Sequence, residues 1–199
     1  MTATRSGILG GTFDPPHLGH LVLAAAARRE LALDRVLFVP AGEPWRKSDR
    51  EIAPAEARRA MVAAAIARLA WAELSTVELE RPGPSYSAET ARELAADGEE
   101  WWLILGGDAL SDLPHWHEPA ELLATVRLAV AARDDHDGVA DALLELVPGA
   151  AARIDRVPMS SLTVASTELR ARVREGRSTL GLVPEATRAV VDELGLYRA

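Results

Sequence analysis

The chain of 199 residues contains no cysteine, which excludes disulfide bonds, thiolate metal sites and a cysteine nucleophile. Lysine and arginine number 22 against 30 acidic residues, and the formal net charge of -8 leaves no basic face for long DNA or RNA. Apolar runs such as residues 21–27, LVLAAAA, end at arginines well before they could cross a bilayer, and no signal peptide opens the sequence. We therefore expect a cytoplasmic protein with no nucleic-acid or membrane partner, for which a small anionic ligand remains open.

Strand-like and helix-like segments alternate along the chain. The expected strands are 6–10, 35–40, 74–79, 101–105, 127–131 and 152–157. The expected helices are 18–30, 54–69, 88–96 capped by Ser87, 118–123, 139–146 and 184–194, with 160–176 a loop that feeds another helix. This order predicts a Rossmann-like, doubly wound parallel sheet with helices on both faces and a small helical C-terminal part. Without repeats or a visible boundary, we expect a single domain over residues 1–199 whose ligands lie at the carboxyl ends of the strands.

Residues 10–21, GGTFDPPHLGHL, join a glycine pair, two prolines and two histidines immediately before an expected helix. Glycine lets the backbone approach a ligand closely, and free amides at a helix N-terminus attract anions. His17 and His20, three residues apart, lie on the same side of the first turn and are expected to face such an anion. A zinc site is less expected, because helical zinc ligands usually have spacing four and a third partner. The ordinary alternative is a helix cap in which both histidines bond to backbone.

The passage matches neither of the common phosphate-binding fingerprints. It lacks the GxGxxG spacing of a dinucleotide-binding turn, and no Gly-Lys-Ser/Thr of a Walker loop follows it. A different kind of phosphate site is therefore expected.

The same passage resembles the GxFDPxHxGH signature of the nucleotidyltransferase superfamily, and in detail it resembles the bacterial nicotinate-nucleotide adenylyltransferases. The resemblance continues along nearly the whole chain. The further matching motifs are VPAGEPWRK at 39–47, SYSAET at 85–90, WWLILGGDALSDLPHWHEPAELL at 101–123, VASTELRARVREG at 164–176 and LVPEATRAVVDELGLY at 182–197. Several motifs in the right order are far more specific than any one of them alone.

The resemblance implies an activity. The reaction is adenylyl transfer from ATP to nicotinate mononucleotide, which gives nicotinate adenine dinucleotide and pyrophosphate in NAD biosynthesis. Mg²⁺ is implied as a cofactor that enters with ATP and is held by the phosphates, with no metal site made by the protein alone. Because the family forms no covalent enzyme intermediate, its residues position the reactants and stabilise the charge that develops at the α-phosphate.

The resemblance also implies three groups of site residues. The group that acts on the phosphates as catalytic residues is His17, His20, Lys47 and Arg170. The group that lines the ATP pocket is Gly10, Gly11, Thr12, Phe13, Gly19, Asp108, Ser166 and Thr167, with Asp108 on the ribose hydroxyls. The group that binds nicotinate mononucleotide is Ser87, Trp116 and His117, with Trp116 stacked on the pyridine ring. Ordinary alternatives are a solvated Lys47, a helix-surface Arg170, a capping Asp108 and a core Trp116.

Several positions depart from the family pattern. Ala165 stands where a serine is usual, and Arg46 stands where histidine precedes the lysine. Ser87 and Glu89 replace threonine and aspartate, and His117 replaces an aromatic hydroxyl residue. The phosphate side is thus better supported than the acceptor side, and nicotinamide mononucleotide remains an alternative acceptor. A non-catalytic nucleotide-binding module and a protein-interaction domain remain further alternatives, and the sequence leaves a homo-oligomer open.

Overall fold

A computed structural model describes residues 3–44, 52–95, 99–132, 141–159 and 162–198 of the chain. Its strands are β1 (Arg5–Gly11), β2 (Arg35–Pro40), β3 (Ala72–Leu74), β4 (Glu100–Leu105), β5 (Arg127–Ala132) and β6 (Ile154–Pro158). Its helices are α1 (Leu18–Glu30), α2 (Ala55–Ile66), α3 (Val77–Glu80), α4 (Ser87–Leu94), α5 (Gly107–Asp112), α6 (Pro119–Thr125), α7 (Asp141–Leu146), α8 (Ser166–Arg174) and α9 (Glu185–Glu193). Short 3-10 turns cover Leu113–His115 and Ala150–Arg153.

The six strands form one sheet in the order β3-β2-β1-β4-β5-β6. β4 pairs in parallel with β1 and with β5, and β5 pairs in parallel with β6. The strand order reverses between β1 and β4, and right-handed crossovers in a sheet with such a reversal carry helices to both faces. The interior of β4 is buried throughout, as expected for a strand covered on both sides. The expected doubly wound fold and its helical C-terminal part, α8 and α9, are confirmed.

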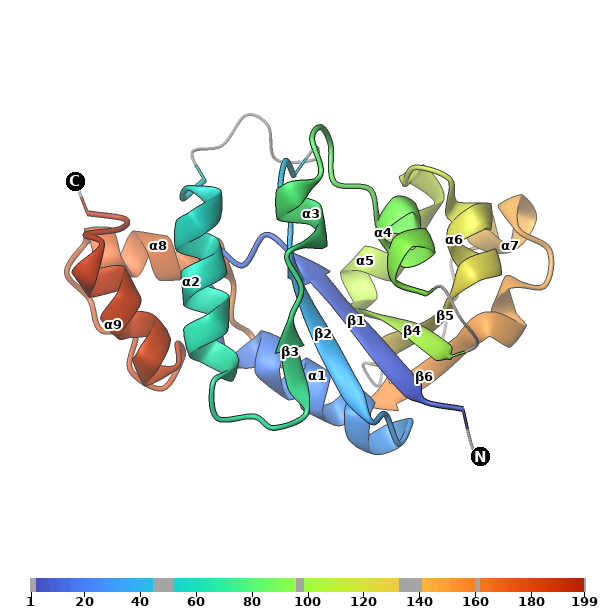
Figure 1. The fold of residues 1–199 in the computed structure, drawn as a ribbon, viewed down its shortest axis with the longest axis horizontal. Helices are drawn as coiled ribbons and strands as arrows, with labels where there is room; N and C mark the ends of the chain where they lie inside the picture. Colours follow the sequence, from blue (N-terminus) through green and yellow to red (C-terminus); the bar gives the residue numbers. More distant parts are fainter. Residues whose placement is uncertain (1–2, 45–51, 96–98, 133–140, 160–161, 199) are drawn as a thin grey trace. The chain divides into compact units, whose positions relative to one another are not determined.

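The chain forms two compact units, each made of three separate segments. The first unit comprises Met1–Gly10, Leu23–Leu37 and Tyr86–Ser161, and the second comprises Gly11–Val22, Phe38–Ser85 and Leu162–Ala199. Within the first unit α4 packs against α6, and within the second unit α2 packs against α9 (Figure 1). The expectation of a single domain over residues 1–199 stays a prediction.

The expected strand over residues 74–79 is wrong. The extended segment is Ala72–Leu74 alone, and the alternating Val-Glu-Leu-Glu that follows it forms the short helix α3. The turn is closed locally, because the amides of Leu79 and Glu80 both donate to the carbonyl of Thr76. Alternation of apolar and charged residues over four positions was therefore too short a pattern to distinguish a strand from one helical turn.

One smaller expectation also differs from the structure. Ser87 is the first residue of α4 rather than its cap, since Tyr86 precedes the helix and no side chain caps it. Asp108 lies in the first turn of α5, because the chain turns into a helix directly after Gly106. Among the described residues no helix combines the length and the apolar character needed to cross a membrane.

Candidate active site

A cavity of about 280 Å³ lies in the second unit, where the chain leaves β1. It is lined by Gly11, Thr12, Phe13, Asp14, His20, Ile52, Ala165, Ser166, Thr167 and Arg170. Two segments about 150 residues apart in sequence thus meet around one space, namely the GTFD passage with His20 and the start of α8. Seven of the residues that the sequence assigned to phosphates or ATP line this cavity: Gly11, Thr12, Phe13, His20, Ser166, Thr167 and Arg170.

His20 is fixed by the helix that carries it. The backbone amide of His17, just before α1, donates to Nδ1 of His20 at 3.1 Å, while the amide of His20 donates back to the carbonyl of His17 at 3.0 Å. The first contact is the side-chain half of a capping box, with an imidazole in place of the usual Glu or Gln, and the second is a backbone bond of the first turn. Because Nδ1 accepts a hydrogen bond, the proton of neutral His20 lies on Nε2. His20 therefore bonds to the backbone at the start of the helix while its ring lines the cavity, so the cap alternative and the ligand-binding prediction are compatible.

His17 lies against His20 and does not line the cavity. The two rings stack with centroids 3.7 Å apart and an interplanar angle of 27°. His17 is buried, and its Nδ1 is buried without a hydrogen-bond partner among the described residues. Burial lowers the pKa of His17 to about 4, so this ring is neutral at physiological pH. Phe13 supports the pair from the other side, with its ring 4.9 Å from that of His20 in an edge contact.

The start of α8 forms the opposite wall of the cavity. The hydroxyl of Ser166 donates to the carbonyl of Pro15 at 3.0 Å, which ties the helix to the Pro-Pro turn. Ala165 precedes the helix and provides no side-chain cap, so the first amides of α8 are left for another acceptor. Arg170 lies one turn further on and donates from Nη1 to the carbonyl of Asp14 at 2.8 Å. A guanidinium and a helix N-terminus thus share one wall, which suits an anion.

Two glycines of the motif occupy different environments. A Cβ placed on Gly10 meets no atom of the described residues within 4 Å, so none of them fills the space beside it. A Cβ on Gly19 would come within 3.0 Å of Nδ1 of His17, so Gly19 leaves room for the buried imidazole. The sequence assigned both glycines to ATP binding, whereas the contact of Gly19 in the described structure is with His17.

Sequence reasoning missed Arg58, whose side chain is 2% exposed. Its guanidinium donates to the carbonyls of Thr12, Ala41, Gly42 and Ala53. A buried guanidinium is costly unless its donors are satisfied, and here they hold together the segments that surround the cavity. Nothing in the sequence distinguishes Arg58 from its exposed neighbour Arg59 except that helical spacing puts Arg58 on the same face as Met61 and Val62.

The residues assigned to the ribose and to the acceptor all lie in the first unit. Asp108 is exposed on the first turn of α5, directly after β4. Trp116 is partly buried, and its Nε1 donates to Asp112 at 3.4 Å. His117 stacks on Tyr86 with ring centroids 4.1 Å apart, so the start of α4, with Ser87, and residue 117 share one neighbourhood. The sequence had not singled out Tyr86.

Lys47, the remaining residue predicted to bind phosphate, and its neighbour Arg46 lie outside the described residues. Among the residues that are described, no group of three or more His, Asp or Glu side chains could hold a metal ion. Of the described residues on the cavity wall, Asp14 alone carries a carboxylate, and it is already bonded to Tyr197 and Ala53. The donor set therefore fits a Mg²⁺ ion held by nucleotide phosphates and water better than one held in a protein cage.

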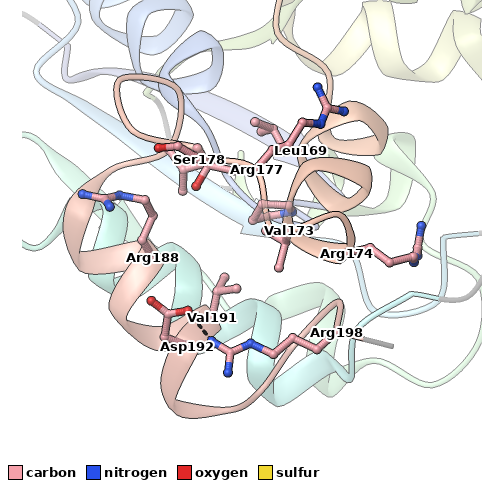
Figure 2. Close-up of a pocket in the computed structure, with 13 residues that line it drawn as sticks. Leu169, Val173, Arg174, Arg177, Ser178, Arg188, Val191, Asp192 and Arg198 are labelled. Atoms are coloured by element: carbon pink, nitrogen blue, oxygen red, sulfur yellow. Dashed lines mark hydrogen bonds and ion pairs between the residues drawn. The ribbon is translucent and has the colours of Figure 1, made fainter.

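A second cavity, of about 490 Å³, lies between α8 and α9 (Figure 2). Figure 2 shows the side chains of Arg174, Arg177 and Arg188 pointing in different directions, while Arg198 is bonded to Asp192. Diverging guanidinium groups do not form a common anion site. The second cavity is lined by none of the residues that the sequence assigned to a catalytic or binding role.

Known proteins with similar sequences cover the whole chain. The cytidylyltransferase-like family model matches residues 8–172. A protein of Roseiflexus sp. (strain RS-1) named "Probable nicotinate-nucleotide adenylyltransferase" is 43% identical over 199 residues, which span 100% of this chain and 100% of that protein. A protein of Methylibium petroleiphilum with the same name is 42% identical over 189 residues, which span 94% of this chain and 87% of that protein.

Solved structures share the fold at low sequence identity. The Plasmodium falciparum nicotinic acid mononucleotide adenylyltransferase complexed with NaAD has a TM-score of 0.74 at 17% identity, covering 98% of this chain and 97% of that chain. The same enzyme complexed with APC has a TM-score of 0.71 at 18% identity, with the same coverage. These structures share the fold, and the family model with the full-length relatives shows that the chain belongs to the cytidylyltransferase-like family and, within it, to the nicotinate-nucleotide adenylyltransferases.

Proposed function

We propose that this protein transfers the adenylyl group of ATP to nicotinate mononucleotide. A phosphate oxygen of the mononucleotide attacks the α-phosphorus of ATP, the bond from that phosphorus to the β-phosphate oxygen breaks, and pyrophosphate leaves with the electron pair. The products are nicotinate adenine dinucleotide and pyrophosphate. Full-length relatives named for this activity support the proposal.

The arrangement of His20 is the observation that carries the proposal. Its Nδ1 accepts the bond from the His17 amide, which fixes the tautomer and holds the ring on the cavity wall before any ligand binds. The same cavity wall offers Arg170 and the first amides of α8. A site that forms no covalent intermediate lowers the activation barrier mainly by stabilising the negative charge of the transition state, and hydrogen-bond donors already held in position do this best.

The remaining roles follow from position. His17, neutral and stacked on His20, keeps that ring in place and avoids two adjacent cations. Lys47 adds a charge on the phosphates, and Asp108 accepts hydrogen bonds from the ribose hydroxyls. Mg²⁺ enters with ATP and offsets the charge of its phosphates. Trp116 stacks on the pyridine ring, and the start of α4 with Ser87 and His117 receives the nicotinate carboxylate.

Pyrophosphate release by the purified protein with ATP and Mg²⁺ tests the proposal, in parallel with nicotinate mononucleotide and nicotinamide mononucleotide. We expect turnover with the acid and much weaker turnover with the amide, because amide donors in the pocket select a carboxylate. Comparable turnover with both would remove the acid specificity from the proposal, and turnover with neither would overturn it. His20→Ala should lose about 10²-fold or more in kcat, as expected when one preorganised donor is removed.

The matched control for His20→Ala is His115→Ala. His115 is a histidine of the first unit whose side chain is 76% exposed, and it contacts neither cavity. This variant should keep the wild-type rate.

A further inference from the structure

A buried polar chain of contacts joins Tyr197, after the last helix, to Arg170 on the cavity wall. Its central member is Asp14, which is 2% exposed and follows Phe13 in the motif. The family motif contains this aspartate, but the functional assignments derived from the sequence gave it no role, and they gave none to Tyr197. Both residues, together with Arg170, belong to the second unit.

Each oxygen of the Asp14 carboxylate has its own partners. Oδ1 accepts hydrogen bonds from the hydroxyl of Tyr197 at 2.6 Å and from the amide of Ala53 at 3.3 Å. Oδ2 lies 3.5 Å from Nη1 of Arg170, and the same Nη1 donates to the Asp14 carbonyl at 2.8 Å. Asp14 therefore orients one edge of the Arg170 guanidinium, while Nη2 lies toward Thr167 on the cavity wall at 3.5 Å from its hydroxyl.

Two residues in the left-handed backbone conformation turn the chain after α9 so that the Tyr197 hydroxyl reaches Asp14. Gly195 has φ 62° and Tyr197 has φ 63°, and the amide of Leu196 donates back to Val191 at the end of α9. A left-handed conformation is uncommon for a bulky residue, so the surrounding contacts must hold it. Burial raises the pKa of Tyr197, as does its bond to Asp14, so the phenol keeps its proton and always acts as the donor.

The charges explain why the tyrosine matters to Arg170. A buried carboxylate must be satisfied by donors, and Asp14 has two on Oδ1 and one ion pair on Oδ2. Without the Tyr197 hydroxyl, the carboxylate keeps one weak bond on Oδ1 and is free to rotate toward the strongest remaining donor, the Arg170 guanidinium. That guanidinium would then turn away from the cavity, where the phosphates need it.

We propose that Tyr197 is a positioning residue, which acts through Asp14 to keep the outer nitrogen of Arg170 directed to the phosphates of ATP. This inference rests on the proposed function, because it assigns Arg170 to ATP phosphates. It goes beyond that function by including a residue after α9 in the organisation of the phosphate site.

Tyr197→Phe tests the inference, because it removes a single oxygen, with its bond to Asp14 and its weak contact to the Met61 sulfur, and keeps the ring. All rates are measured at a temperature where circular dichroism shows the variant fully folded. We expect kcat/KM for ATP to fall about tenfold, with KM for nicotinate mononucleotide unchanged, since the proposed function assigns Arg170 to the phosphates of ATP. Asp14→Asn should show a larger fall, because it removes the charge that pairs with Arg170 while keeping an acceptor for the tyrosine.

Arg198→Ala is the matched control, since it alters the neighbouring residue and breaks only an exposed pair with Asp192. It should keep wild-type kinetics. A fully folded Tyr197→Phe protein with the wild-type kcat/KM for ATP would overturn the inference, as would equal changes in the KM of both substrates.

A binding measurement separates this inference from the proposed function. The dissociation constant of ATP is measured by calorimetry for the wild-type protein and for Tyr197→Phe. If the wild-type protein binds ATP but turns over neither mononucleotide, the proposed acceptor reaction fails, while weaker ATP binding by the variant still supports the positioning role. Equal ATP affinity in the two proteins, with normal turnover by the wild type, would contradict the positioning role alone.

Discussion

The stability of the protein should depend on the protonation of His17 below neutral pH. Burial lowers the pKa of His17 from its usual 6.5 to about 4 in the folded state. Between these values the unfolded chain binds a proton that the folded protein does not, so lowering the pH favours unfolding. The difference in pKa lowers the free energy of unfolding by about 3 kcal/mol once His17 is protonated in both states. Between about pH 7.5 and pH 5 it lowers that free energy by about 2 kcal/mol.

Urea unfolding of the wild-type protein and of His17→Asn at these two pH values measures the effect. The wild-type protein should lose about 2 kcal/mol more than the variant on going to the lower pH, because the variant has no imidazole to protonate. Because each protein is compared with itself at the two pH values, any loss of stability that the substitution causes equally at both values cancels. His115→Asn, on an exposed histidine, is the control and should lose as much stability as the wild type. If His17→Asn loses as much as the wild type, His17 is not a buried neutral base and the explanation of its stacking on His20 is wrong.

Two further predictions concern the glycines and the acceptor side. Gly10→Ala should leave the unfolding midpoint unchanged, because the added methyl meets no atom of the described residues, and it should abolish most turnover, because the methyl would occupy ligand space. Gly42→Ala should instead destabilise the fold by several kcal/mol, roughly as other strained backbone substitutions do, because its Cβ would lie 2.1 Å from the carbonyl oxygen of Glu78. Equal midpoints for the two variants in thermal denaturation would refute this assignment. Tyr86→Ala should raise the KM for nicotinate mononucleotide and leave the KM for ATP unchanged, because it removes the ring stacked on His117; a rise in the KM for ATP instead would place that stack on the other substrate.

The strands and the phosphate cavity could be predicted because their signals are local. Residues 35–40 and 101–105 are continuous apolar runs, which suit a strand buried on both faces, and β2 and β4 match them to within one residue. The cavity residues on the β1 side come from one short motif, so their proximity required no long-range contact. Arg170 and Ser166 could be added only through the order of motifs, because nothing near them in sequence indicates what they face.

The buried polar contacts could not be predicted. Arg58 and Arg59 are adjacent and chemically identical, yet the first is buried under four carbonyl oxygens and the second pairs with exposed Glu56. Which of them is buried depends on how α2 is rotated against its neighbours, and that rotation comes from tertiary packing. The sequence around Tyr197 does not indicate that its hydroxyl bonds to Asp14, because that contact joins residues separated by 183 positions.

The two interleaved units have a consequence for how the acceptor preference can change. Ser87, Trp116 and His117, which are proposed to bind the mononucleotide, lie on the single segment Tyr86–Ser161 together with Asp108, which is proposed to bind the ATP ribose. The phosphate cavity is assembled from pieces on either side of that segment. A recombination event with two crossovers, one near each end of the segment, would exchange these four residues in one inheritable block and leave His20, Arg170 and Tyr197 untouched. On the proposed assignments, specificity for the mononucleotide would travel with that segment, while the phosphate site would come from the host chain.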